Sequence, residues 1–205
     1  MTLTLEEGRQ AVLLARETLE AHVLGSVSVG RTAASGPFAE MRGVFVTLNL
    51  ADPVPDRLRG CIGFPFPVKP LEEAIREATI AAASEDPRFP PVSEAELDSL
   101  VVEVSVLTPP KDLVAPRRQD LPSMVKIGED GLIIGDGLQS GLLLPQVATE
   151  FGMDQVGFLS QACMKAGLPP DSWLNGDTRV QVFQAEIFSE TNPRGEVLRV
   201  KPSES

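Results

Sequence analysis

The sequence is poor in the side chains that build disulfide frameworks and zinc sites. It contains two cysteines, Cys61 and Cys163, and a single histidine, His22. Two cysteines are too few for a disulfide framework and fit a reducing compartment, so we expect a cytoplasmic protein. Because the only imidazole stands apart from two unclustered cysteines, we expect no zinc site. No EF-hand spacing is present either, and no metal is expected.

Long apolar runs are also missing. No segment approaches the roughly 20 apolar residues that a membrane-spanning helix needs. The first residues include Glu6 and Glu7, where a secretory signal would be basic and then apolar. Acidic residues outnumber basic ones by 29 to 18, for a formal net charge of -11. Such a field repels nucleic acids and anionic membranes, so we expect neither as a partner and keep RNA binding as a minor alternative.

Hydrophobic periodicity predicts helices and strands along most of the chain. Apolar stripes, capping boxes and glycine stops predict helices at residues 4–22, 70–84, 145–151 and 154–167. Strands are expected at residues 43–48, 57–62, 100–107 and 178–188, and a hairpin at 131–144. Residues 191–205 are polar, and we expect a flexible tail there. The frequent hairpins favour an α+β fold with mainly antiparallel sheets.

The hairpin of residues 43–48 and 57–62 contains the most informative segment. Strand alternation places Arg57, Arg59 and Cys61 on one face of that hairpin. Its register follows from aligning the polar faces of the two strands. That rule predicts three pairs: Asn49 with Arg57, Thr47 with Arg59, and Phe45 with Cys61.

This arrangement gives Cys61 two interpretations. It is a small packing residue, as free cysteines often are, or a catalytic thiolate or redox-sensitive group whose ionisation Arg57 and Arg59 favour. The flanking Gly60 and Gly63 would let another backbone or a ligand approach closely. His22 lies near the end of the first predicted helix and is interpreted as a helix-terminal residue. A carboxylate would then have to act as the base.

Other candidate site residues are polar side chains elsewhere in the chain. Arg59 forms either a structural ion pair or a bidentate clamp for a carboxylate or phosphate. Arg88 follows Asp86 in a turn, where a local contact between the two is the favoured interpretation. Glu103 interrupts a Val-rich strand, and we expect it to pair with Arg59, with general-base catalysis as the alternative. Gln146 either supplies amide hydrogen bonds to a ligand or only caps a helix.

Several segments together resemble one family. Leu58 to Gly63 read Leu-Arg-Gly-Cys-Ile-Gly, which is similar to the hallmark of the AMMECR-type proteins, a family named after a human chromosomal deletion region. Further segments resemble family blocks in the same order: residues 86–91, 103–109, 140–148 and 165–170, with Trp173 following. The resemblance covers roughly residues 5–188.

The resemblance implies two closely packed α+β parts, each with an antiparallel sheet and helices, and the hallmark segment near a cleft between them. No linker marks a boundary within residues 1–205, which leaves room for a discontinuous part. The family resemblance also implies relatives that are encoded beside, or fused to, radical SAM and Memo-like proteins. It implies no established reaction or cofactor. We therefore expect an enzyme or enzyme accessory that handles a small anionic or polar metabolite around Cys61. The alternative is a noncatalytic module that docks such a protein partner.

Overall fold

The computed structural model describes residues 2–26, 35–52 and 57–200, which fall into two compact units. Unit 1 combines Met1–Leu107 with Glu186–Lys201, so it is built from two separate chain segments, and unit 2 contains Thr108–Ala185. Each unit has its own hydrophobic cluster and its own antiparallel sheet. The α+β fold class predicted from the sequence is confirmed.

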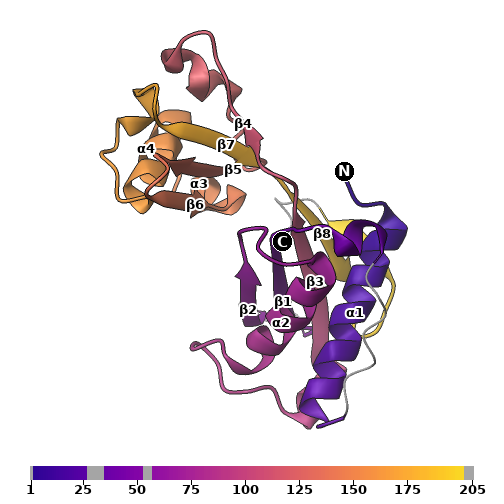
Figure 1. The fold of residues 1–205 in the computed structure, drawn as a ribbon. Helices are drawn as coiled ribbons and strands as arrows, with labels where there is room; N and C mark the ends of the chain where they lie inside the picture. The colour runs from indigo at the N-terminus through magenta and orange to yellow at the C-terminus, as the bar shows by residue number, and fades with distance from the viewer. Residues whose placement is uncertain (1, 27–34, 53–56, 201–205) are drawn as a thin grey trace. The chain divides into compact units, whose positions relative to one another are not determined.

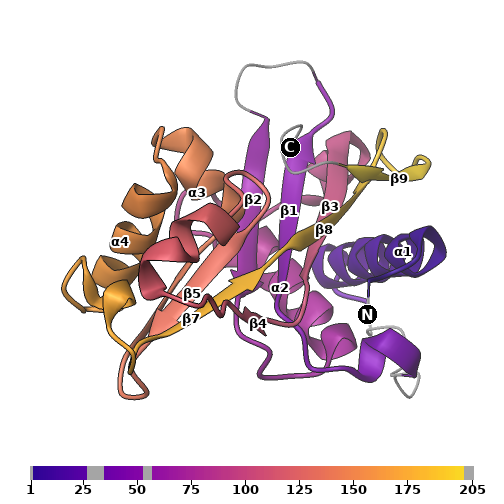
Figure 2. The same cartoon turned by 90° about the horizontal axis from the view of Figure 1, so that it is seen from above.

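Unit 1 is a five-stranded sheet with two helices on one face (Figures 1 and 2). The strand order is β2-β1-β3-β8-β9. The strands are β1 (Val44–Leu50), β2 (Leu58–Phe64), β3 (Leu100–Leu107), β8 (Ala185–Glu190) and β9 (Val197–Val200), and the helices are α1 (Leu5–Val23) and α2 (Leu71–Ser84). Alternate residues of β1, namely Val44, Val46 and Leu48, are fully buried in the cluster that these helices cover.

Local sequence signals account for where the helices of unit 1 begin and end. Thr4 and Glu7 form the predicted capping box at the start of α1, and Gly25 follows its end with φ 63°. Pro70 precedes α2, whose buried alanines allow close helix packing. Short 3-10 turns occupy η1 (Gly36–Ala39) and η2 (Glu94–Ser99). None of the described helices has the length and apolar character needed to cross a membrane.

Unit 2 is a four-stranded sheet in the order β4-β7-β5-β6 with helices packed against it. Its strands are β4 (Lys111–Asp112), β5 (Gly131–Gly135), β6 (Ser140–Leu143) and β7 (Arg179–Phe183), and its helices are α3 (Pro145–Glu150), α4 (Gln155–Lys165), η3 (Arg118–Met124) and η4 (Ser172–Leu174). The predicted hairpin is β5 and β6, and Asp154 caps α4 as expected. Cys163 is fully buried in α4 and packs in the core of this unit.

Two sequence predictions about the C-terminal region are wrong. The single strand expected at residues 178–188 is two strands, β7 and β8, which belong to different sheets and flank Gln184. The apolar alternation shifts by one residue at Val182 and Phe183, and a single shift of this kind does not show that the chain changes sheets. The flexible tail expected at residues 191–205 is also wrong where it can be assessed, because β9 pairs with β8 and Val197 is buried. Residues 201–205 lie outside the described part.

Candidate functional site

The β1–β2 hairpin has a different register from the predicted one. Thr47 pairs with Cys61 and Phe45 with Gly63, a shift of two residues. Alternation repeats every two residues, so a two-residue shift keeps the same faces aligned and the pattern does not discriminate against it. A bulge follows Leu48. Leu48 pairs with Gly60 and Asn49 with Leu58, so Arg59 has no paired residue in β1. The bulge breaks the alternation that placed Arg57 and Arg59 on the face of Cys61.

Three polar side chains form a row across the sheet of unit 1. Thr47 pairs with Cys61 on one side and with Glu103 on the other, so side chains from β2, β1 and β3 lie next to one another on one face. The row lies on the face opposite Val46, Leu48 and the helices, because alternate residues of β1 point to opposite faces. The sequence did not identify Thr47 as the neighbour of Cys61, because the predicted register paired Thr47 with Arg59.

The thiol of Cys61 is half-buried and is held by a neighbouring hydroxyl. Thr47 Oγ1 donates to Cys61 Sγ at 3.2 Å. Burial raises the pKa of the Cys61 thiol, and this effect outweighs the Thr47 hydrogen bond and the charge of Arg88, which both lower it. The expectation that Arg57 and Arg59 promote ionisation is wrong, because the cation that acts on the thiol is Arg88. At neutral pH Cys61 is therefore a neutral thiol.

Glu103 is the most perturbed carboxylate of the row. Glu103 lies in the middle of β3, whose other residues are almost all apolar, and is only 9% exposed. Burial raises its pKa to about 6, while the charge of Arg57 lowers it. Its carboxyl group forms no hydrogen bond or ion pair with any residue that the structure describes. The prediction that Glu103 pairs with Arg59 is wrong. The alternative, that Glu103 acts as a general base, stays a prediction and is consistent with its raised pKa.

Arg59 turns away from the row and has a structural partner. Its Nε donates to Glu96 Oε1 at 2.7 Å, and its Nη2 donates to Glu96 Oε2 and to the carbonyl oxygen of Pro91. The arginine side chain is 9% exposed. This ion pair holds the pKa of Glu96 down to about 2. Of the two roles left open for Arg59, the structural ion pair is the one observed. Glu96 carried a sequence signal only as a capping-box residue with Ser93.

A clasp formed by Asp86 and Arg88 holds the outer edge of β2 at Cys61. Asp86 Oδ2 accepts the backbone N–H of Cys61 at 2.9 Å, and Arg88 Nη2 donates to the Cys61 carbonyl oxygen at 3.3 Å. Arg88 also binds Asp86, with its Nη2 2.7 Å from Oδ2, which confirms the predicted contact. The hydrogen bonds from Arg88 and Cys61 hold the pKa of Asp86 far below its usual range. The clasp satisfies backbone groups that an edge strand would otherwise leave open.

The hallmark segment thus occupies β2, at the edge of the sheet in unit 1. The AMMECR1 family matches residues 12–188, which include this segment, its Asp86–Arg88 clasp and Glu103. The chain belongs to the AMMECR1 family.

AMMECR1 relatives in archaea are similar over almost their whole length. A protein of Thermococcus onnurineus is 52% identical over 95% of both chains. Protein MJ0810 of Methanocaldococcus jannaschii is 50% identical over 97% of this chain and 98% of its own. The crystal structure of the uncharacterized protein PH0010 from Pyrococcus horikoshii has 49% identity, covers 96% of this chain and 97% of its own, and superposes with a TM-score of 0.76.

The two glycines of the AMMECR1 hallmark make close packing of the backbone possible. A Cβ at Gly60 would overlap the carbonyl oxygen of Ala82 at the end of α2. A Cβ at Gly63 would overlap the carbonyl oxygen of Val44 and the ring of Phe45. The close approach predicted for these glycines is therefore an approach of protein groups.

The remaining candidates lie outside this arrangement. Gln146 is an exposed residue of α3 in unit 2, and its backbone oxygen accepts a hydrogen bond from Thr149. Arg57 donates its Nε to the Leu50 carbonyl oxygen and places its charge near Glu103. His22 is exposed at the end of α1. Within residues 2–26, 35–52 and 57–200, no group of three His, Cys, Asp or Glu side chains is arranged to hold a metal ion.

Proposed function

We propose that this protein is an enzyme, or an accessory to an enzyme, that binds a small polar metabolite at the row of Cys61, Thr47 and Glu103. The observation that supports this proposal is Glu103, a buried carboxyl without a partner among the described residues and with a pKa of about 6. Burying such a group without a compensating hydrogen bond lowers stability, and perturbed carboxyls of this kind are concentrated at functional sites.

The chemistry of the row favours proton transfer over attack by sulfur. A carboxyl with a pKa of about 6 has substantial populations of both forms near neutral pH, which suits a general acid and base. Glu103 would accept a proton from the bound metabolite and return it later in the cycle. Cys61 and Thr47 would hydrogen-bond the metabolite beside it. Arg59 is paired with Glu96 and Arg88 with Asp86, so the cation of the hallmark region that would bias the row toward anionic ligands is Arg57, whose charge lowers the pKa of Glu103.

Native mass spectrometry of the purified protein tests this proposal without knowing the ligand. We expect the wild type to retain a co-purifying small molecule that dissociates on unfolding. Glu103→Gln should lose most of that molecule, because Gln replaces one acceptor oxygen of the carboxylate with an N–H donor and cannot carry its charge. The matched control is Glu17→Gln, since Glu17 is an exposed glutamate of α1 in the same unit. Small-molecule occupancy that is identical in wild type, Glu103→Gln and Cys61→Ala would refute the proposal.

A second function, a noncatalytic docking module for a radical SAM or Memo-like protein, is supported by an apolar surface in unit 1. Met41, Phe66 and Val68 are 56%, 39% and 66% exposed. They lie close together, since Met41 pairs with Pro70 and Val68 donates its N–H to the carbonyl oxygen of Phe66. Exposed apolar groups gathered in one place are typical of protein interaction sites.

Co-purification with each candidate partner separates the two functions. The docking function requires a stoichiometric complex that forms normally with Cys61→Ala and Glu103→Gln and is weakened by Val68→Asp. The metabolite function instead requires small-molecule occupancy that falls in Cys61→Ala and Glu103→Gln and is unchanged in Val68→Asp. A complex that is insensitive to Val68→Asp would exclude this surface as the docking site.

A further inference from the structure

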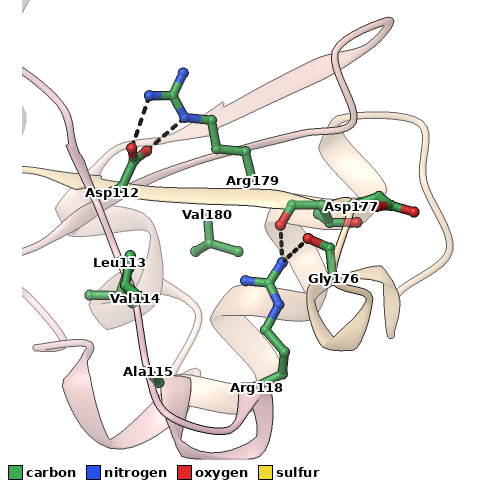
Figure 3. Close-up of a pocket in the computed structure, with 10 residues that line it drawn as sticks. Asp112, Leu113, Val114, Ala115, Arg118, Gly176, Asp177, Arg179 and Val180 are labelled. Carbon is green, nitrogen blue, oxygen red and sulfur yellow. Dashed lines mark hydrogen bonds and ion pairs between the residues drawn. The ribbon is translucent and has the colours of Figure 1, made fainter.

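Unit 2 contains a hollow of about 390 Å³ that the Cys61 row does not involve (Figure 3). All of the residues that line it belong to this unit: Asp112 to Ala115, Arg118, and Gly176 to Val180. Its volume falls within the range of about 300 to 1,000 Å³ that is usual for small-molecule sites. Its accessible apolar wall is formed by the exposed Val114 and the half-buried Ala115, whereas Leu113 and Val180 are buried in the core of the unit.

Arg118 is held in this hollow by backbone oxygens of the loop before β7. Its Nε donates to the carbonyl oxygen of Asn175 at 3.1 Å, and its Nη2 donates to the carbonyl oxygens of Asn175, Gly176 and Thr178. These contacts fix the guanidinium plane. None of them uses Nη1, and no hydrogen bond from Nη1 to another described residue exists. The two N–H groups of Nη1 are therefore available to a ligand.

The positive charge of Arg118 is not balanced by a neighbouring carboxylate. In the part of the chain that the structure describes, Arg118 forms no ion pair. Asp112 is bound by Arg179, whose Nε is 2.6 Å from Oδ1. Asp177 is exposed, and its side chain points away from Arg118 in Figure 3. Carbonyl oxygens orient the guanidinium but carry only partial charges, so a full positive charge remains beside the apolar wall.

We propose that this hollow binds a small organic carboxylate. The carboxylate accepts hydrogen bonds from Nη1 of Arg118, and the apolar part of the ligand packs against Val114 and Ala115. A planar guanidinium with a free edge is suited to a carboxylate oxygen. A phosphate dianion fits less well, because it carries more negative charge toward Asp112 and Asp177 and leaves the apolar wall uncovered.

Titration of the isotope-labelled protein with hexanoate, followed by ¹H–¹⁵N NMR, tests this site. We expect shifts at the backbone amides of Val114, Ala115 and Gly176, which line the hollow. Hexanamide has the same chain without the charge. It should bind with at least about tenfold lower affinity, as expected for loss of a charge-assisted hydrogen bond. Arg118→Gln should lower hexanoate affinity to a similar extent.

The neighbouring arginine provides the matched control. Arg117 is exposed and paired with Asp120, so Arg117→Gln removes the same charge and should leave hexanoate affinity unchanged. Equal shifts from hexanoate and hexanamide, or wild-type affinity in a folded Arg118→Gln, would overturn the proposal. If Arg118→Gln does not fold, Arg118→Lys replaces it, since it keeps the charge but loses the planar fork. Undiminished hexanoate binding by that variant would overturn the assignment to the guanidinium.

Discussion

Replacing Glu103 with Gln should stabilise unit 1 at neutral pH, although Glu103 lies at the candidate site. The carboxyl is 9% exposed, and burial raises its pKa to about 6 from an ordinary value of 4.5. Ionised Glu103 is therefore less favourable in the folded protein than in the unfolded chain. Gln has nearly the same shape and cannot ionise, so it removes this penalty.

The sign and size of the effect follow from proton linkage. Below the unfolded pKa of 4.5, Glu103 is protonated in both states and its ionisation does not affect stability. As the pH rises from 4.5 toward about 6, the unfolded chain releases the proton first, so the free energy of unfolding falls. Above that window both states are ionised and the loss is complete. At about 1.4 kcal/mol for each pH unit, the loss is about 2 kcal/mol.

Urea denaturation from about pH 4 to about pH 8, followed by far-UV circular dichroism, measures this effect. Circular dichroism is preferred because the single tryptophan, Trp173, belongs to unit 2 and does not report on unit 1. The difference between Glu103→Gln and wild type should be smallest at the acidic end, grow through the window and then level off at about 2 kcal/mol.

The shape of this pH dependence decides whether the reasoning holds. A difference that does not change with pH would mean that Glu103 has an ordinary pKa in the folded protein and that its unusual burial has no electrostatic consequence. A difference of the opposite sign would mean that ionised Glu103 has a stabilising partner. Glu17→Gln on the exposed face of α1 should show no such pH dependence.

Two further predictions concern the hallmark segment. Gly60→Ala should lower the free energy of unfolding by about 1 to 3 kcal/mol in urea titrations, because its Cβ overlaps the Ala82 carbonyl oxygen; Gly176→Ala, with open space at its Cβ, should lower it less. Alkylation of Cys61 by iodoacetamide should be slower in the native protein than in urea at neutral pH and should accelerate above the ordinary thiol pKa of 9.0. Arg88→Met should slow it further, since the charge of Arg88 lowers the thiol pKa. Native alkylation as fast as in urea would contradict the buried, neutral thiol.

Much of the secondary structure could be predicted from local signals. The Thr4–Glu7 capping box and the start of α4 at Asp154 are satisfied within a few residues of chain, so no tertiary information was needed to find them. The Asp86–Arg88 contact was found for the same reason. The family was predicted correctly because the hallmark is a contiguous segment that keeps its order relative to other blocks.

Partners that are distant in the sequence were not predictable in this way. Arg59 could pair equally well with several acids, and the bulge after Leu48 turned it toward Glu96 instead of Glu103. The pKa of Glu103 could not be foreseen either, because it depends on burial, and burial depends on everything that packs around the strand.

The sequence by itself determined the fold class, the main helices and strands, and membership of the AMMECR1 family, because these depend on periodicity, capping and contiguous motifs. Only the tertiary structure decided which side chains meet. A shift of two residues in β2 preserves the alternation pattern yet changes the neighbour of Cys61 from Phe45 to Thr47. Register, the bulge and burial are properties of the assembled sheet, and they are the features that brought Cys61, Thr47 and Glu103 together.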